Sequence, residues 1–147
     1  MENKPIWKNR LSWEEYAINM AEVVATRSED PWIKVGAVVL RHNNTIASCG
    51  YNGLPSGAYL LSDEWADRNY RRKFIVHAES NCLNYIKRGE GRLIAVTLSP
   101  CVDCIKLIAS KDIKKIIYKE EYTTDPNCLD DIKILCKKFD IELKKYD

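Results

Sequence analysis

The sequence predicts an α/β fold, a three-layer α/β/α sandwich in which helices cover both faces of a five-stranded mixed sheet. Three observations lead to this prediction. The chain has 147 residues, of which 46% are apolar, and a chain of this length folds as one domain with a substantial core. A β-hairpin pattern lies near residues 33–51. Strand-like and helix-like segments then alternate towards the C-terminus, as they do when helices join parallel strands.

The first fifty residues predict a helix followed by the hairpin. Ser12 is a typical N-cap and Glu15, three residues later, completes a capping box, so the helix is expected to begin there. The segment IKVGAVVL at 33–40 is rich in β-branched residues and predicts a buried strand. After an Asn-Asn turn, TIASCGY at 45–51 predicts the returning strand of the hairpin.

Two loop-like segments follow the hairpin. The sequence NGLPSG at 52–57 is dense in residues that form turns. The stretch 62–73 is polar and charged, and although it can hold a short helix, its length predicts a functional loop. A cluster of basic residues lies towards its end: Arg68, Arg71, Arg72 and Lys73.

The rest of the chain alternates between helices and strands. The predicted helices cover about 77–88, 102–110 and 127–138, and the predicted strands cover 93–99, 114–119 and 141–146. Strands separated by helices favour parallel pairing, so the sheet becomes mixed where the hairpin joins it. Open α/β sheets place their sites at the carboxyl ends of such strands, where the predicted helices begin.

Charge and hydropathy exclude several classes of protein. The net charge of +2 is too mild to predict a nucleic-acid partner. No apolar run reaches the ~18 residues of a membrane helix, and the polar start MENKPIWKNRLSW is unlike a secretory signal. We therefore expect a cytoplasmic protein without a membrane partner, whose six cysteines are core thiols or metal ligands. Four of them are scattered and are expected to be core thiols: Cys49, Cys82, Cys128 and Cys136.

One histidine and two cysteines have the spacing of a metal site. His77 opens a predicted helix, and Cys101 follows a proline to open the next, with Cys104 one turn further. Positions i and i+3 share one side of a helix, and the helix N-terminus favours the thiolate that a metal needs. Catalytic zinc takes three protein ligands and leaves its fourth position open. The three residues therefore predict a Zn²⁺ site.

Glu79 lies two positions after His77, which makes it a poor fourth ligand on a helix. A carboxylate beside such a site can instead take a proton from water and pass it on, because zinc lowers the pKa of water towards ~7. His-x-Glu together with Pro-Cys-x-x-Cys is the signature of zinc-dependent nucleobase deaminases. Glu79 is therefore the predicted catalytic acid and base.

Three other interpretations of the cysteine pair remain open from the residues alone. Cys-x-x-Cys after a strand also occurs as a thioredoxin-like redox pair. Half of a structural zinc ribbon fits less well, because no second pair has ribbon spacing. A zinc-stabilised binding module without catalysis would hold its metal with four protein ligands and would not need Glu79.

The sequence resembles the cytidine deaminase-like superfamily and, within it, the deoxycytidylate (dCMP) deaminases. The resemblance spans about residues 12–146 and rests on VGAVVL, GYNGLPSG, HAESN, LSPCVDCIKLIASKDIKKIIY and EEY. The family more often has a larger apolar residue in place of Ser80 and a cysteine in place of Val76. The resemblance implies one deaminase domain over residues 1–147 with the cytidine deaminase-like fold.

The resemblance also implies an activity and its residues. The reaction is hydrolytic deamination of dCMP to dUMP with loss of ammonia, which supplies dUMP for thymidylate synthesis. Glu79 would protonate N3 of the cytosine and then the leaving amine. Backbone N–H groups near Ala78 and Cys101 would stabilise the tetrahedral intermediate. Asn52 matches a family asparagine that bonds the sugar or base, and Tyr122 matches a tyrosine near the nucleotide phosphate.

A 5′-phosphate also needs cationic partners, and arginine grips phosphate with two hydrogen bonds. Arg71 and its basic neighbours precede His77, and Arg27 lies at the end of the first predicted helix. The resemblance further implies a homo-oligomer, with a hexamer favoured, that dCTP activates and dTTP inhibits with Mg²⁺. Four tryptophans are consistent with subunit contacts: Trp7, Trp13, Trp32 and Trp65.

Related enzymes with the same chemistry are the nearest alternatives. A deaminase acting on a polynucleotide base needs a positive track for the backbone, which the near-neutral charge disfavours. A riboflavin-pathway deaminase normally carries a reductase domain, for which this chain has no segment. Deamination of dCTP in place of dCMP stays open.

Overall fold

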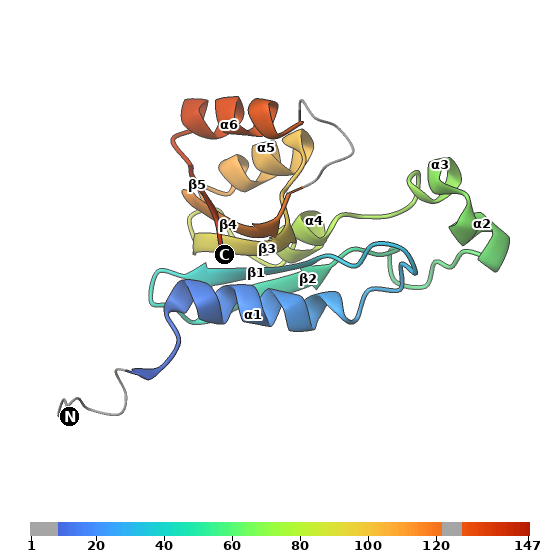
Figure 1. The fold of residues 1–147 in the computed structure, drawn as a ribbon, viewed down its shortest axis with the longest axis horizontal. Coiled ribbons are helices and arrows are strands. Elements are labelled where there is room, and N and C mark those ends of the chain that lie inside the picture. The colour runs from blue at the N-terminus through green and yellow to red at the C-terminus, as the bar shows by residue number, and fades with distance from the viewer. Residues whose placement is uncertain (1–8, 122–127) are drawn as a thin grey trace.

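The computed structural model describes residues 9–121 and 128–147 as a three-layer α/β/α sandwich (Figure 1). The five-stranded sheet has the order β2-β1-β3-β4-β5. Strand β1 is antiparallel to both β2 and β3, whereas β3, β4 and β5 are parallel, so the predicted mixed sheet is confirmed. The strands are β1 (Gly36–Arg41), β2 (Ile46–Tyr51), β3 (Gly91–Leu98), β4 (Lys115–Glu120) and β5 (Glu142–Lys145).

One face of the sheet is covered by the first helix, α1 (Trp13–Ala25). Its N-cap is the predicted Ser12, whose Oγ accepts a hydrogen bond of 3.1 Å from the backbone N–H of Glu15. The small residues Ala17 and Ala21 are fully buried, so the helix lies close against the sheet. The helix packs on the side chains that alternate to this face of the central strands: Val38, Leu40, Leu93, Ala95 and Ile117.

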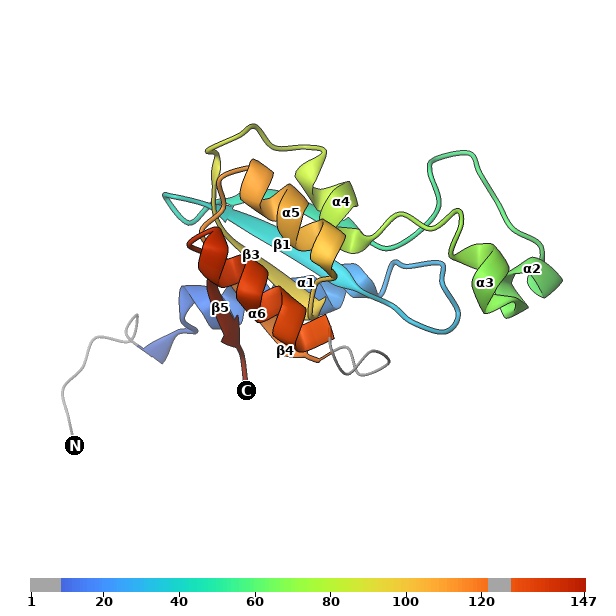
Figure 2. The ribbon, with the colours of Figure 1, turned by 90° about the horizontal axis from the view of Figure 1, so that it is seen from above.

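The other face carries three helices (Figures 1 and 2), α4 (Ala78–Leu83), α5 (Val102–Ser110) and α6 (Cys128–Lys138). They cover the strand side chains that point to this face of the sheet, such as Val39 and Ile116. Helix α4 ends at Leu83, earlier than the predicted 88. The chain continues in tighter turns, with Tyr85 N–H bonded to Cys82 O at 3.3 Å and Ile86 N–H to Leu83 O at 3.3 Å, which keep Ile86 buried.

The first strand begins at Gly36 and not at residue 33, because the side chain of Asn52 takes the place of a ladder partner. Its Oδ1 accepts from Val35 N–H at 2.8 Å, and its Nδ2 donates to Ile33 O at 2.8 Å. The segment 33–35 is therefore held as a wall beside the sheet rather than as part of it. Trp32, just before it, is 62% exposed.

The charged stretch 62–73 contains two short helices, α2 (Ser62–Ala66) and α3 (Arg68–Arg71), where a functional loop was predicted. Together with their flanking loops they form an arm, residues 54–75, that projects beyond the sheet (Figure 2). The two ends of the arm meet in a bridge of two backbone hydrogen bonds, from Gly53 N–H to Val76 O at 3.1 Å and from Val76 N–H to Gly53 O at 2.8 Å. A further bond of 3.1 Å joins Trp32 Nε1 to Trp65 O, so the arm is anchored to the loop after α1.

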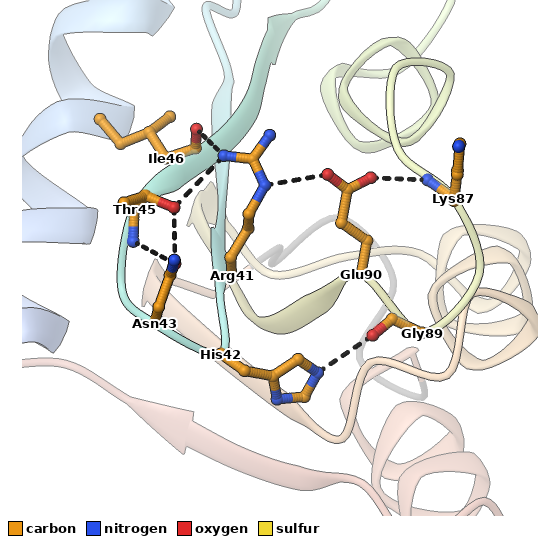
Figure 3. Close-up of polar contacts among 8 residues, drawn as sticks. All are labelled: Arg41, His42, Asn43, Thr45, Ile46, Lys87, Gly89 and Glu90. Carbon is orange, nitrogen blue, oxygen red and sulfur yellow. Dashed lines mark hydrogen bonds and ion pairs between the residues drawn. The ribbon is translucent and has the colours of Figure 1, made fainter.

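The hairpin turn between β1 and β2 is tied to the turn before β3 (Figure 3). Arg41 Nε donates to Glu90 Oε2 at 2.9 Å, and the other oxygen of Glu90 accepts from Lys87 N–H at 2.9 Å. His42 Nε2 lies 3.0 Å from Gly89 O. These contacts fix the end of the sheet opposite the first turns of α4 and α5, and His42 is an exposed turn residue there.

The cysteines differ in part from the predicted core thiols. Cys82 and Cys136 are buried, whereas Cys49 is exposed because its position on the edge strand β2 points away from α4. The side chain of Cys128 lies outside the described residues. Within the described ranges no helix is long and apolar enough to cross a membrane.

Gly50 allows α4 to approach strand β2. A Cβ there would lie 2.4 Å from the backbone N of Cys82 and 2.8 Å from the Ala78 carbonyl oxygen, both of which are backbone atoms that cannot rotate away. We expect Gly50→Ala to destabilise the fold by about 1–3 kcal/mol, a fall in Tm of roughly 2–4 °C per kcal/mol. Thermal unfolding measures this, with Cys49→Ala as the exposed neighbouring control. An unchanged Tm for Gly50→Ala would contradict the close packing.

Candidate metal centre and adjoining cavity

Three potential metal ligands converge where α4 and α5 begin side by side. His77 is the N-cap of α4, Cys101 is the N-cap of α5, and Cys104 lies in the first turn of α5. His77 Nδ1 lies 3.3 Å from Cys104 Sγ and 3.5 Å from Cys101 Sγ, and all three ligand atoms are within 4.8 Å of one another. Helix α5 follows β3 as predicted, but α4 follows the arm and not a strand.

The donor set fits zinc in both its chemistry and its dimensions. Zn–N bonds of about 2.0–2.1 Å and Zn–S bonds of about 2.3 Å place N and S donors roughly 3.6 Å apart around a tetrahedral ion. A hydrogen bond with Cys104, and a further one with His77, lower the pKa of Cys101 to about 4. The hydrogen bond with Cys101 in turn raises the pKa of His77. The cluster therefore already favours a thiolate, which is the form that binds zinc.

Glu79 lies directly beside these ligands, on the first turn of α4. Its side chain is only 4% exposed, and this burial raises the pKa of its carboxyl group, while the neighbouring Cys104 and His77 offset part of the rise. A buried carboxyl group with a raised pKa can exchange protons near neutral pH. The position suits proton transfer better than metal binding.

A cavity of about 220 Å³ opens beside the three ligands, and both His77 and Glu79 line it. The arm contributes three arginines to the lining: Arg68, Arg71 and Arg72. The segment after α1 contributes Asp30, Ile33 and Val35. The cavity thus combines a metal-ligating cluster, a buried acid and a group of cations.

Arg71 is the predicted phosphate ligand that the fold brings into the cavity. It is only 8% exposed, because its guanidinium lies 5.9 Å from the centre of the Trp32 ring and donates to Trp65 O at 3.2 Å. Its other N–H groups have no partner among the described residues. Arg27 is exposed and is not among the described residues that line the cavity.

Of the other predicted substrate contacts, Asn52 and Ala78 line the cavity. Asn52 lines the cavity at 7% exposure, but its amide already bonds Ile33 and Val35 as described above. Ala78 also lines the cavity and is 1% exposed. Tyr122 lies outside the described residues.

Sequence reasoning missed Ser28 and Asp30, which shape the wall beside Asn52. Ser28 Oγ donates to Asn52 O at 2.7 Å and accepts from Asp30 N–H at 3.2 Å, and both side chains are 4% exposed. The signal was the serine and the aspartate before a proline in RSEDP, two short polar residues that often bond nearby backbone.

The topology and the His-Cys-Cys cluster with its buried glutamate define a zinc-binding domain of the deaminase type. Comparison with known families agrees. The family model of the cytidine and deoxycytidylate deaminase zinc-binding region matches residues 11–120. The chain belongs to this family.

Two curated relatives and one solved structure illustrate the similarity. Mouse deoxycytidylate deaminase is 32% identical over 143 residues, which cover 92% of this chain and 80% of that protein. ComE operon protein 2 of Bacillus subtilis is 36% identical over 124 residues, which cover 80% of this chain but only 64% of that protein. The dCMP deaminase from the cyanophage S-TIM5, in complex with dCMP and dUMP, superposes with a TM-score of 0.72. It is 30% identical, and the superposition covers 99% of this chain and 100% of that one.

Proposed function

We propose that the chain catalyses the zinc-dependent hydrolytic deamination of dCMP to dUMP, with release of ammonia, and so supplies dUMP for thymidylate synthesis. The observation that carries the proposal is the convergence of His77, Cys101 and Cys104 beside buried Glu79 on one cavity. The cyanophage relative with dCMP and dUMP bound supports the choice of nucleotide.

The residues divide the chemistry between them. Zinc held by His77, Cys101 and Cys104 supplies a Lewis acid that makes water nucleophilic near neutral pH. Glu79 takes a proton from the attacking water and delivers it to N3 of the cytosine as the new bond forms at C4. The carboxylate then takes the remaining proton from the hydroxyl on C4 and passes it to the amine, so that the C4–N bond breaks, the C4 carbonyl forms and ammonia leaves. Burial raises the pKa of Glu79, which favours the protonated form that this last step needs.

The surrounding backbone completes the proposed base site. Ala78 and Cys101 both line the cavity, and we assign backbone N–H groups near them to the charge that develops on the pyrimidine, because donors placed in advance stabilise such charge. The side chain of Asn52 uses one N–H and one oxygen lone pair to bond Ile33 and Val35. Its second N–H is therefore the one assigned to the sugar or base. Tyr122 lies outside the described residues, and its role near the phosphate stays a prediction from the family resemblance.

The 5′-phosphate is assigned to the arginines of the arm, with Arg71 first, since it lines the cavity and the one hydrogen bond given for its guanidinium, to Trp65 O, leaves other donors for a ligand. We expect Arg71→Ala to lower kcat/KM for dCMP about 10-fold to 100-fold, the range of a lost charged hydrogen bond. The rate on deoxycytidine, which has no phosphate, should stay the same. Steady-state kinetics on both substrates separates this from a general loss of structure.

Arg27→Ala is the matched control for the phosphate assignment, because Arg27 is exposed and does not line the cavity among the described residues. It should leave both rates within about twofold of the wild type. If Arg27→Ala shows the phosphate-dependent loss and Arg71→Ala does not, the phosphate lies at the end of α1 and the assignment to Arg71 is wrong.

The proposed function is tested by ammonia release from dCMP, CMP, dCTP and deoxycytidine, each with and without dTTP. The expected result is a strong preference for dCMP over deoxycytidine, because the arginines bind the phosphate. Equal rates on these two substrates would count against the phosphate site. Release from dCTP alone, or no release from any mononucleotide, would contradict the proposed substrate.

We also propose a cytoplasmic homo-oligomer, with a hexamer favoured, that dCTP activates and dTTP inhibits with Mg²⁺. Exposed Trp13 (49%) and Trp32 (62%) support subunit contacts, since aromatic side chains are enriched at interfaces. Light scattering with and without each nucleotide tests the assembly, and a monomer under all conditions would reject it.

A further inference from the structure

Asp30 presents an acceptor to the cavity that the proposed chemistry does not use. Its side chain is 4% exposed and lines the cavity. One oxygen, Oδ1, accepts from the backbone N–H groups of Trp32 at 2.8 Å and Ile33 at 3.1 Å. No hydrogen bond or ion pair joins the other oxygen, Oδ2, to another described residue, and no fully buried side-chain oxygen of the described residues lacks a partner, so Oδ2 is accessible from the cavity. A carboxylate oxygen that opens on a cavity can accept a hydrogen bond from a bound ligand that displaces its water.

The carboxylate is held firmly in this position. The two backbone bonds fix Oδ1, and Ser28 Oγ accepts from the Asp30 N–H at 3.2 Å. Asn52 binds the next part of the same segment through Ile33 O and Val35 N–H. A group fixed from several sides can select a ligand atom by position.

The chemistry of the acceptor limits which part of a nucleotide it can bind. A carboxylate accepts hydrogen bonds and repels phosphate. The phosphate is better bound by the arginines of the arm. The nucleotide dCMP has two donor groups, the 4-amino group and the 3′-hydroxyl. The amino group must lie at Glu79 and the metal ligands for the reaction to occur. The 3′-hydroxyl is the donor that remains.

We propose that Asp30 determines specificity by accepting a hydrogen bond from the 3′-hydroxyl of the deoxyribose. The placement agrees with the rest of the cavity. Asp30 is two residues from Trp32, whose ring lies against the Arg71 guanidinium, and the wall then runs through Ile33 to Val35. The sugar thus lies between the phosphate and the base. This inference rests on the proposed function.

The test compares dCMP with 2′,3′-dideoxy-CMP, which lacks only the 3′-hydroxyl. The wild type should prefer dCMP by about tenfold or more in kcat/KM, the effect of leaving a buried charged acceptor unpaired. Asp30→Asn can keep the bonds to Trp32 and Ile33 through its carbonyl oxygen while its amide replaces the free acceptor. In this variant the rate on dCMP should fall, the rate on the dideoxy substrate should stay the same, and the preference should shrink towards one.

Glu29→Gln is the matched control, because Glu29 is the exposed neighbouring acid and accepts from Leu54 N–H outside the described lining of the cavity. It should keep the full preference for dCMP. If Asp30→Asn does not fold, Asp30→Ser makes the same comparison, since a serine hydroxyl also accepts from backbone N–H groups two residues on.

The outcomes separate this inference from the proposed function. Equal losses on both substrates in Asp30→Asn would place Asp30 at the base or in the fold and overturn the inference. A wild type that deaminates dCMP without preference over the dideoxy substrate would also overturn it, with the proposed function intact. A wild type that deaminates neither substrate would overturn the proposed function itself.

Discussion

Replacing Glu79 by glutamine is expected to lower kcat for dCMP by about 10²-fold to 10⁴-fold, the contribution of a positioned general acid and base. The amide has nearly the shape of the carboxyl group, so the packing of α4 should survive. It cannot take a proton from water or deliver one to N3. Zinc content should stay at that of the wild type, because Glu79 is not one of the three converging ligands. Steady-state kinetics and elemental analysis of the same preparation measure both effects.

Ser80→Ala is the control for Glu79→Gln, because Ser80 is the next residue on α4, is half-buried and is not among the described residues that line the cavity. It should keep nearly the full rate. A Glu79→Gln protein that binds zinc and still deaminates dCMP at the wild-type rate would remove the mechanism. Loss of zinc in this variant would instead indicate that Glu79 holds the metal site together.

Replacing Cys101 by alanine is expected to abolish both zinc binding and deamination. A catalytic site has only three protein ligands, and removal of one leaves a weak His-Cys pair. Cys101 is half-buried at the N-cap of α5, so the fold should tolerate alanine better there than at buried Cys104. Elemental analysis should find far less than one zinc per chain, and no dUMP should form from dCMP.

Cys49→Ala provides the comparison for Cys101→Ala, because Cys49 is an exposed thiol on β2 outside the cluster. It should keep its zinc and its activity. If Cys101→Ala keeps a full complement of zinc, the metal is bound elsewhere. If it loses zinc but keeps activity, the metal is structural and the proposed catalytic role of the cluster is wrong.

The metal cluster could be predicted from the sequence because its members lie in two contiguous motifs. His77 and Glu79 are two residues apart, and Cys101 and Cys104 are three apart, so local helix geometry fixes most of their relations. The expectation that both helices begin at the same edge of the sheet then brought the two motifs together. In the same way a run of β-branched residues predicted the first strand, because a strand that is buried on both faces has a nearly continuous apolar sequence.

The walls of the cavity could not be predicted in this way because long-range contacts form them. Residues 33–35 have strand composition, yet Asn52 binds them through its side chain and draws them out of the ladder. Arg27 and Arg71 are equivalent as basic residues in the sequence, and only the packing of Arg71 against Trp32 separates a buried cation from an exposed one. Such pairings join segments that no local pattern connects.

Zinc titration of the metal-stripped wild-type protein, followed by the formation of dUMP from dCMP, tests the central claim most directly. The account predicts that activity returns in proportion to added zinc and reaches its plateau at one zinc per chain. Full activity without metal, or a plateau of bound zinc with no dUMP formed, would contradict it.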